Sequence, residues 1–108
     1  MELIKIGTLV NGDQAVQWIP KLIEHKFESI SVNYFNSSGD TDFAELAKKV
    51  KDAIGDSGIT VSTVSVYCNP LRDEAGIKEW EKCIDNAKAF GADLVTGFSG
   101  RLDGESVD

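Results

Sequence analysis

The chain has 108 residues, of which 42% are hydrophobic and 27% are charged. This length and composition predict a single globular domain over residues 1–108. The net charge is −7, with a pI of about 4.6. The one dense basic cluster, Lys48-Lys49-Lys51, shares its predicted helix with Glu45 and Asp52. A negatively charged surface repels the phosphates of nucleic acid. The charge balance therefore argues against nucleic acid as a partner and favours small polar solutes.

No apolar stretch approaches the roughly 18 residues that a membrane span needs. Segment 1–6 carries neither the basic leader nor the cleavage site of a signal peptide. We therefore expect a cytoplasmic protein without a membrane partner. Cys68 and Cys83 have no CxxC spacing, so we expect reduced thiols and not metal ligands.

Strands and helices alternate along the predicted chain. Three helical patterns separate four β-rich segments, which are Leu3–Leu9, Ser29–Tyr34, Thr60–Tyr67 and Asp93–Phe98. The strands begin about 30 residues apart, as βαβ units do. The pattern predicts an α/β fold with a parallel βαβαβαβ sheet, and the last residues resemble the start of a further βα loop.

Local signals place the helix ends. Asp13 is expected to cap the first helix, in which Pro20 predicts a kink or a late start. Asp42, with Glu45 three residues later, resembles a capping box for the second helix, and Gly55 can stop it. Gly91 is expected to end the third helix. The predicted buried side of that helix comprises Ile77, Trp80, Cys83, Ile84, Ala87 and Phe90.

The third strand alternates apolar and small polar residues. Strict alternation puts Val61 on one face with Thr63, Ser65 and Tyr67, and Ser62, Val64 and Val66 on the other. The pattern does not decide which face is covered by helices.

Parallel α/β proteins bind ligands at the carboxyl ends of their strands. Four segments rich in amides, hydroxyls and aromatics fall there: 8–11, 33–36, 67–70 and 97–101. These groups suit sugars, although turns select many of the same residues. Segment 97–101 could cradle a phosphate beside Arg101, or its glycines could serve tight turns. His25 is the only histidine and falls at the opposite end of the strands.

Several segments resemble the N-terminal half of the sugar phosphate isomerase/epimerase family, within the xylose isomerase-like TIM-barrel superfamily. They are residues 4–8, 18–25, 27–30, 59–62, 90–95 and 97–101. One departure is Lys26, where similar sequences have glycine.

The resemblance implies half of a (β/α)8 barrel, truncated within the βα loop after strand four. It implies a divalent metal (Mn²⁺, Mg²⁺, Co²⁺ or Zn²⁺) and two acid/base glutamates in the full-length family, with their ligands in the absent half. No catalytic or metal residue transfers to this chain, for which no cofactor is expected alone. The substrate-binding residues that the resemblance implies are Asn33, Tyr34, Tyr67, Asn69, Phe98 and Arg101.

Three interpretations follow. In the first, the chain is part of a metal-dependent isomerase or epimerase that moves a proton next to a sugar carbonyl, and is inactive alone. In the second, it is a non-catalytic half-barrel scaffold or binding module, natural or engineered, which self-associates through its open edges. In the third, it is a flavodoxin-like doubly wound sheet of order 2-1-3-4, with helices on both faces.

Overall fold

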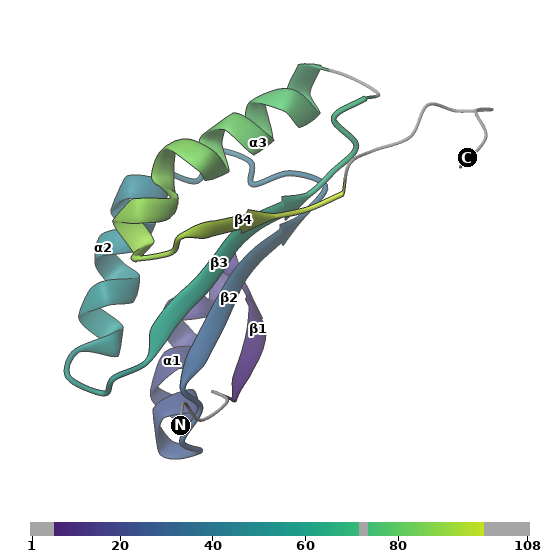
Figure 1. Cartoon of the computed structure of the whole chain (residues 1–108). Helices are drawn as coiled ribbons and strands as arrows, with labels where there is room; N and C mark the ends of the chain where they lie inside the picture. Colours follow the sequence, from purple (N-terminus) through teal and green to yellow (C-terminus); the bar gives the residue numbers. More distant parts are fainter. Residues whose placement is uncertain (1–5, 72–73, 99–108) are drawn as a thin grey trace.

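Four parallel strands form one sheet in the order β1-β2-β3-β4 in the computed structural model, which describes residues 6–71 and 74–98. Helices link consecutive strands (Figure 1). The elements in chain order are β1 (Gly7–Asn11), η1 (Gly12–Gln14), α1 (Ala15–Glu24), β2 (Ser29–Phe35), α2 (Phe43–Ile54), β3 (Thr60–Tyr67), α3 (Glu74–Asn86), η2 (Ala87–Phe90) and β4 (Leu94–Thr96).

This strand order confirms the α/β arrangement expected of a half barrel. A doubly wound sheet would place β1 between two other strands, whereas here β1 pairs with β2 alone among the described strands. The flavodoxin-like alternative is therefore wrong. Among the described helices, none is long and apolar enough to cross a membrane.

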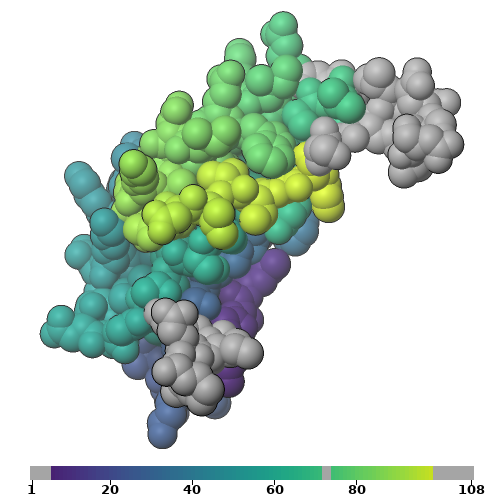
Figure 2. All heavy atoms as spheres, in the orientation of Figure 1, coloured from purple at the N-terminus to yellow at the C-terminus, as the bar shows by residue number. Residues whose placement is uncertain are grey.

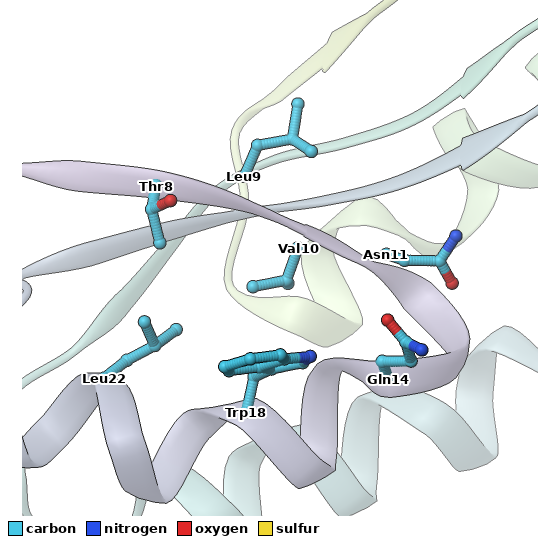
Figure 3. Close-up of a pocket in the computed structure, with 7 residues that line it drawn as sticks. All are labelled: Thr8, Leu9, Val10, Asn11, Gln14, Trp18 and Leu22. Atoms are coloured by element: carbon cyan, nitrogen blue, oxygen red, sulfur yellow. The ribbon is translucent and has the colours of Figure 1, made fainter.

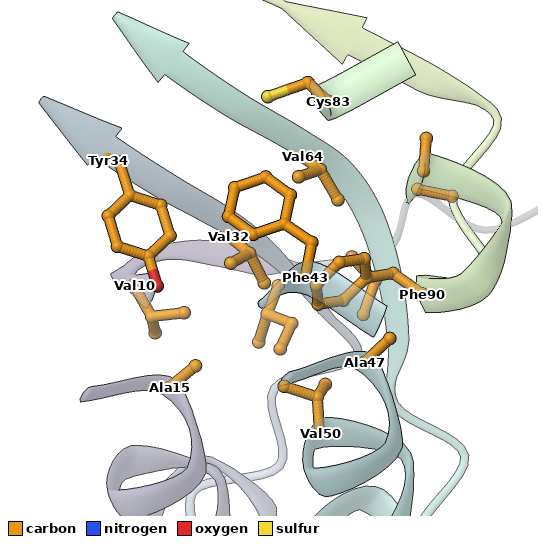
Figure 4. Close-up of a cluster of buried hydrophobic side chains, with 14 of the residues drawn as sticks. Val10, Ala15, Val32, Tyr34, Phe43, Ala47, Val50, Val64, Cys83 and Phe90 are labelled. Carbon is orange, nitrogen blue, oxygen red and sulfur yellow. The ribbon is translucent and has the colours of Figure 1, made fainter. Parts of the chain in front are cut away.

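Alternation along the strands separates an apolar face from a polar one. On β2, Ile30, Val32 and Tyr34 are buried under the helices, whereas Ser31 and Asn33 point to the opposite face. The helices bury their own apolar stripes against the first face (Figure 4). The hydrophobic core is therefore a single layer between the sheet and the three helices.

Phe43 is the centre of that layer. Its ring stacks on Tyr34 at a centroid distance of 5.7 Å and meets Phe90 edge-on at 6.1 Å. Lys82 Nζ lies 4.6 Å from the centroid of the Phe43 ring. One aromatic side chain thus ties α2 to β2, η2 and α3.

A β-bulge corrects the predicted faces of the third strand. Ile30 pairs with Val61 and Ser31 with Thr63, so Ser62 has no partner in the β2–β3 ladder. The extra residue turns Val61 to the helix side, where it is buried with Val64 and Val66. The expectation that Val61 shares a face with Thr63 is wrong, because that prediction assumed unbroken alternation.

The start of α1 also differs from the prediction. The Asp13 side chain does not cap α1, whose N-cap residue is Gln14 and makes no side-chain cap hydrogen bond. The Asn11 side chain caps the preceding η1 turn by accepting the Asp13 N–H at 2.9 Å. The Asp13 carboxylate instead accepts the Tyr34 hydroxyl at 3.1 Å. The turn Gly12–Gln14 leads into α1, which continues through Pro20 as one helix to Glu24.

The predicted ends of α2 are confirmed. Asp42 Oδ1 accepts the N–H groups of Ala44 and Glu45, at 3.0 and 3.2 Å, and Gly55 follows the last turn with φ of 50°. On α3 the predicted buried side is partly wrong. Cys83 is buried, but Ile77 and Ile84 are 47% and 60% exposed, because no described element covers that flank of the helix.

Two helical segments end in the same left-handed turn. After η2, Gly91 has φ of 81°, and the N–H groups of Gly91 and Ala92 bond back to Lys88 and Ala87. After α1, Lys26 has φ of 61°, and the N–H groups of Lys26 and Phe27 bond back to Ile23 and Leu22. Both are Schellman-type ends, but only the first has glycine at the left-handed position.

We predict that Lys26→Gly raises the free energy of unfolding by about 0.5–1 kcal/mol, because the left-handed conformation crowds the Cβ of lysine and glycine has none. Urea unfolding followed by circular dichroism measures the change. Asn36→Gly is the matched control, since Asn36 has φ of 68° and asparagine tolerates this region better. A gain no larger for Lys26→Gly than for Asn36→Gly would contradict the explanation.

Candidate functional site

Three aromatic side chains form a row across the carboxyl ends of neighbouring strands. The Tyr67 ring lies between Phe35 and Phe98, at centroid distances of 5.6 and 5.1 Å. Phe35 and Tyr67 are register partners on β2 and β3, and Phe98 follows β4 by two residues. Phe35 and Phe98 are 58% and 60% exposed. The row is therefore open to a ligand and lies outside the core.

Hydroxyl and amide groups continue this face along the strands. Thr96 Oγ1 hydrogen-bonds Ser65 Oγ at 2.5 Å and lies 3.4 Å from the Tyr67 hydroxyl. Asn33 Nδ2 donates to the Ser31 carbonyl at 3.1 Å, and Ser31 Oγ hydrogen-bonds Thr63 Oγ1. Asn33 and Ser65 are fully buried, so their hydrogen bonds brace the strands beneath the surface. Thr96 is exposed and Tyr67 is half-buried, so these two hydroxyls can exchange hydrogen bonds with a polyol without presenting a charge.

The structure brings three of the six sequence-predicted residues together. Asn33, Tyr67 and Phe98 lie on the face just described. Asn69 lies in the loop after β3, where its Oδ1 accepts the Leu71 N–H at 3.1 Å. Arg101, and with it most of the proposed phosphate cradle, lies outside the described residues.

Tyr34 lies on the other side of the sheet. Its ring is 3% exposed and packs on Phe43. Burial raises the pKa of the Tyr34 phenol, and the nearby Asp13 carboxylate also favours its protonated form. A substrate-binding role for Tyr34 stays a prediction, and the site described here does not include it.

The six substrate-binding residues that the resemblance implies omit Phe35, Ser65 and Thr96, although Phe35 lies within the candidate segment 33–36. Strand alternation could have found them. Phe35 follows Asn33 by two residues, and Ser65 precedes Tyr67 by two, so each shares a face with a residue that was predicted. The interpretation chose residues by their position after a strand and included Tyr34, which alternation assigns to the opposite face.

Gly97 serves close packing at this end of the sheet. A Cβ built on Gly97 would lie 2.7 Å from the Trp80 ring. Gly97 does not adopt a positive φ. Contact with α3 therefore requires a residue without a side chain at Gly97, while the tight-turn explanation for segment 97–101 stays a prediction because residues 99–101 lie outside the described ones.

The loop after β2 is held to α3 by Glu79. Its carboxylate accepts the hydroxyls of Ser37 and Ser38, at 3.0 and 2.6 Å, and the Ser38 N–H at 3.3 Å. Lys82 Nζ donates to Ser38 Oγ at 2.7 Å. Ser38 is 4% exposed, so these hydrogen bonds satisfy a buried polar loop and fix the chain that leaves the Phe35 end of the aromatic row.

No metal centre is evident within residues 6–71 and 74–98, where no three His, Cys, Asp or Glu side chains lie close enough to hold an ion. Both cysteines are free and buried. Burial raises the pKa of the Cys83 thiol to about 11, with a further contribution from Glu79. Cys83 is therefore a protonated core residue and not a thiolate.

Neither models of protein families nor curated protein sequences match this chain. Among solved structures, the apo form of 3-keto-D-glucoside 4-epimerase, YcjR, from E. coli has a similar fold, with a TM-score of 0.63 and 18% sequence identity. The matched region covers 86% of this chain and 37% of that chain. At this identity the likeness shows the fold alone, which corresponds to part of a TIM-barrel-like chain.

We predict that Glu79→Ala loosens the β2–α2 loop and lowers the free energy of unfolding by about 1–3 kcal/mol, because buried Ser38 then loses its charged acceptor. Hydrogen exchange at the Ser38 amide should accelerate. Glu81→Ala is the control, since Glu81 is exposed on the same helix. If exchange at Ser38 is equally fast in both variants, Glu79 does not hold the loop.

The pKa of Cys83 predicts a loss of stability in alkali. Its folded pKa of about 11 lies above the ordinary 9.0. The contribution to stability is therefore complete below about pH 9 and is lost as pH rises toward 11. Urea unfolding at pH 7.5 and pH 10 should show a smaller alkaline loss in Cys83→Ala than in the wild type. Equal losses would contradict the assignment.

Proposed function

We propose that this chain is the N-terminal part of a metal-dependent sugar or sugar phosphate isomerase or epimerase, and that it forms one wall of the sugar-binding pocket. The observation that carries the proposal is the row Phe35–Tyr67–Phe98, which has exposed rings at both ends and lies beside the uncharged hydroxyl of Thr96. The fold shared with a sugar epimerase supports the same interpretation.

The chemistry of this face suits a sugar ring. The C–H groups on one side of a pyranose can pack on an aromatic face such as that of Tyr67, which is large and rigid. The ring hydroxyls can then exchange hydrogen bonds with Thr96 and its neighbours. A face without charges binds such a solute without desolvating an ion. The role assigned to these residues is therefore to bind and orient the sugar.

Proton transfer next to the sugar carbonyl needs groups beyond those described. A divalent ion such as Mn²⁺, Mg²⁺, Co²⁺ or Zn²⁺ would polarise the carbonyl in the proposed enzyme. The described residues do not fit such an ion, since they gather no ligand set. We assign no acid, base or metal ligand within them, and we propose that the 108 residues bind sugar without turning it over.

A second candidate function is a non-catalytic half-barrel module that self-associates. The observation that favours it is the free outer edge of both β1 and β4 among the described strands. In either function we propose a small sugar or sugar phosphate as the ligand and the cytoplasm as the location.

We predict weak, millimolar binding of methyl β-D-glucopyranoside or D-fructose to the ¹⁵N-labelled chain, with amide shifts concentrated at Phe35, Tyr67 and Phe98. Tyr67→Ala should weaken binding about fivefold, because an aromatic contact contributes on the order of 1 kcal/mol. Tyr34→Phe is the matched control and should leave binding unchanged, since it removes a hydroxyl on the other side of the sheet.

Shifts spread over the helices, or binding unaffected by Tyr67→Ala, would contradict the proposed pocket wall. Turnover of D-fructose by the isolated chain with added Mn²⁺ or Co²⁺ would contradict the proposed absence of catalytic groups.

A further inference from the structure

A buried hydroxyl lies under the candidate site. Ser65 is 0% exposed, and its Oγ lies 2.5 Å from Oγ1 of Thr96, its register partner on β4. Within residues 6–71 and 74–98, the Ser65 hydroxyl makes no other hydrogen bond. A buried donor without an acceptor is strongly destabilising. The Ser65 proton therefore points to Thr96 Oγ1, which accepts it.

This direction decides what the Thr96 hydroxyl can offer to a ligand. A threonine hydroxyl has one proton to donate and two lone pairs that accept. One lone pair is taken by Ser65, while the proton stays available. The Tyr67 hydroxyl, at 3.4 Å from Thr96 Oγ1, is too distant to hold that proton firmly. Thr96 therefore presents a hydrogen-bond donor to whatever binds beside it.

The Thr96 donor is within reach of a ligand. Thr96 is exposed at the carboxyl end of β4, and the yellow atoms of β4 lie at the surface in Figure 2. Its neighbour Tyr67 is the middle ring of the aromatic row. A six-membered ring that packs on Tyr67 therefore has the Thr96 donor at its edge, next to the phenol hydroxyl.

We propose that Thr96 is a specificity-determining residue, which selects sugars with a hydrogen-bond acceptor at this point, and that Ser65 sets this polarity. The group that fits best is the carbonyl oxygen of a keto sugar, because it has lone pairs and no proton. A hydroxyl can also accept but must send its own proton elsewhere. An ammonium group can only donate and is rejected. The inference rests on the proposed sugar site and adds its substrate class.

A pocket of about 310 Å³ between β1 and α1 is a competing place for a small ring (Figure 3). Its lining includes the side-chain amides of Asn11 and Gln14, beside Trp18. Amides offer donors and acceptors alike, so a ring bound there would not distinguish a carbonyl from an ammonium group. Amide shifts at Gln14 and Trp18 would mark this pocket, whereas shifts at Tyr67 and Phe98 mark the aromatic row.

Titration of the ¹⁵N-labelled 108-residue chain with cyclohexanone, cyclohexanol and cyclohexylammonium tests the proposal. The three probes share a six-membered ring and differ in their one polar group. We expect shifts at Phe35, Tyr67 and Phe98, with affinity falling in that order. The ammonium should bind about fivefold more weakly than the ketone, although the net charge of −7 favours a cation.

Variants separate the two hydroxyls. Thr96→Val keeps the side-chain shape without the donor, so it should weaken cyclohexanone about fivefold and remove the preference, and Thr96→Ser should restore both. Ser65→Ala leaves Thr96 free to accept, so the preference for ketone over ammonium should vanish while ketone affinity stays within about twofold. Thr60→Val, at the exposed amino end of β3, is the matched control and should change neither.

An unchanged preference in Thr96→Val, or one that survives Ser65→Ala, would overturn the inference. Probe shifts confined to Gln14 and Trp18 would overturn it as well. These outcomes are distinct from the test of sugar binding, because the probes carry no sugar hydroxyls. If Thr96 discriminates the probes as expected while methyl β-D-glucopyranoside fails to bind, the acceptor preference stands and the proposed function does not.

Discussion

The two-residue period of β2 is the constraint on which the rest of the structure depends. Ile30, Val32 and Tyr34 must face the helices together, and Ser31 and Asn33 must then face away together. A shift of one residue would put the polar set against the helices and the apolar set on the opposite face. Because β2 pairs with both β1 and β3, its register fixes which residues of those strands reach each face.

The bulge at Ser62 preserves this separation where the sequence of β3 would break it. Without an extra residue, Val61 would point to the polar face while Val64 and Val66 point to the core. The bulge inserts Ser62 between them, and the Ser62 hydroxyl donates to the Ile30 carbonyl at 3.1 Å. A local irregularity of the backbone thus keeps both faces uniform in chemistry.

Two faces of one sheet therefore have different uses. The helix side is a closed core organised around Phe43. The opposite side is uncharged on its strands and presents exposed aromatics at the carboxyl ends, where parallel sheets place their ligands.

Local chemistry was readable from the sequence by itself. The number of strands, the approximate bounds of β2, β3 and β4, the Asp42 cap and the turn at Gly91 all depend on neighbours a few residues apart, whereas the first strand was expected at Leu3–Leu9 and β1 is described as Gly7–Asn11. The prediction that Asn33, Tyr67 and Phe98 come together also followed from one general rule, that carboxyl ends of parallel strands share an edge.

Only the tertiary structure decided what depends on distant partners. The strand order separated the half barrel from the doubly wound sheet, because both place the same elements in the same sequence. The bulge in β3 arises from pairing with β2. The exposure of Ile77 and Ile84 reflects a flank of α3 that no described element covers. Tyr34 and Tyr67 both end strands, yet one is in the core and the other in the candidate site, because pairing and helix packing, not residue type, assign each face its environment.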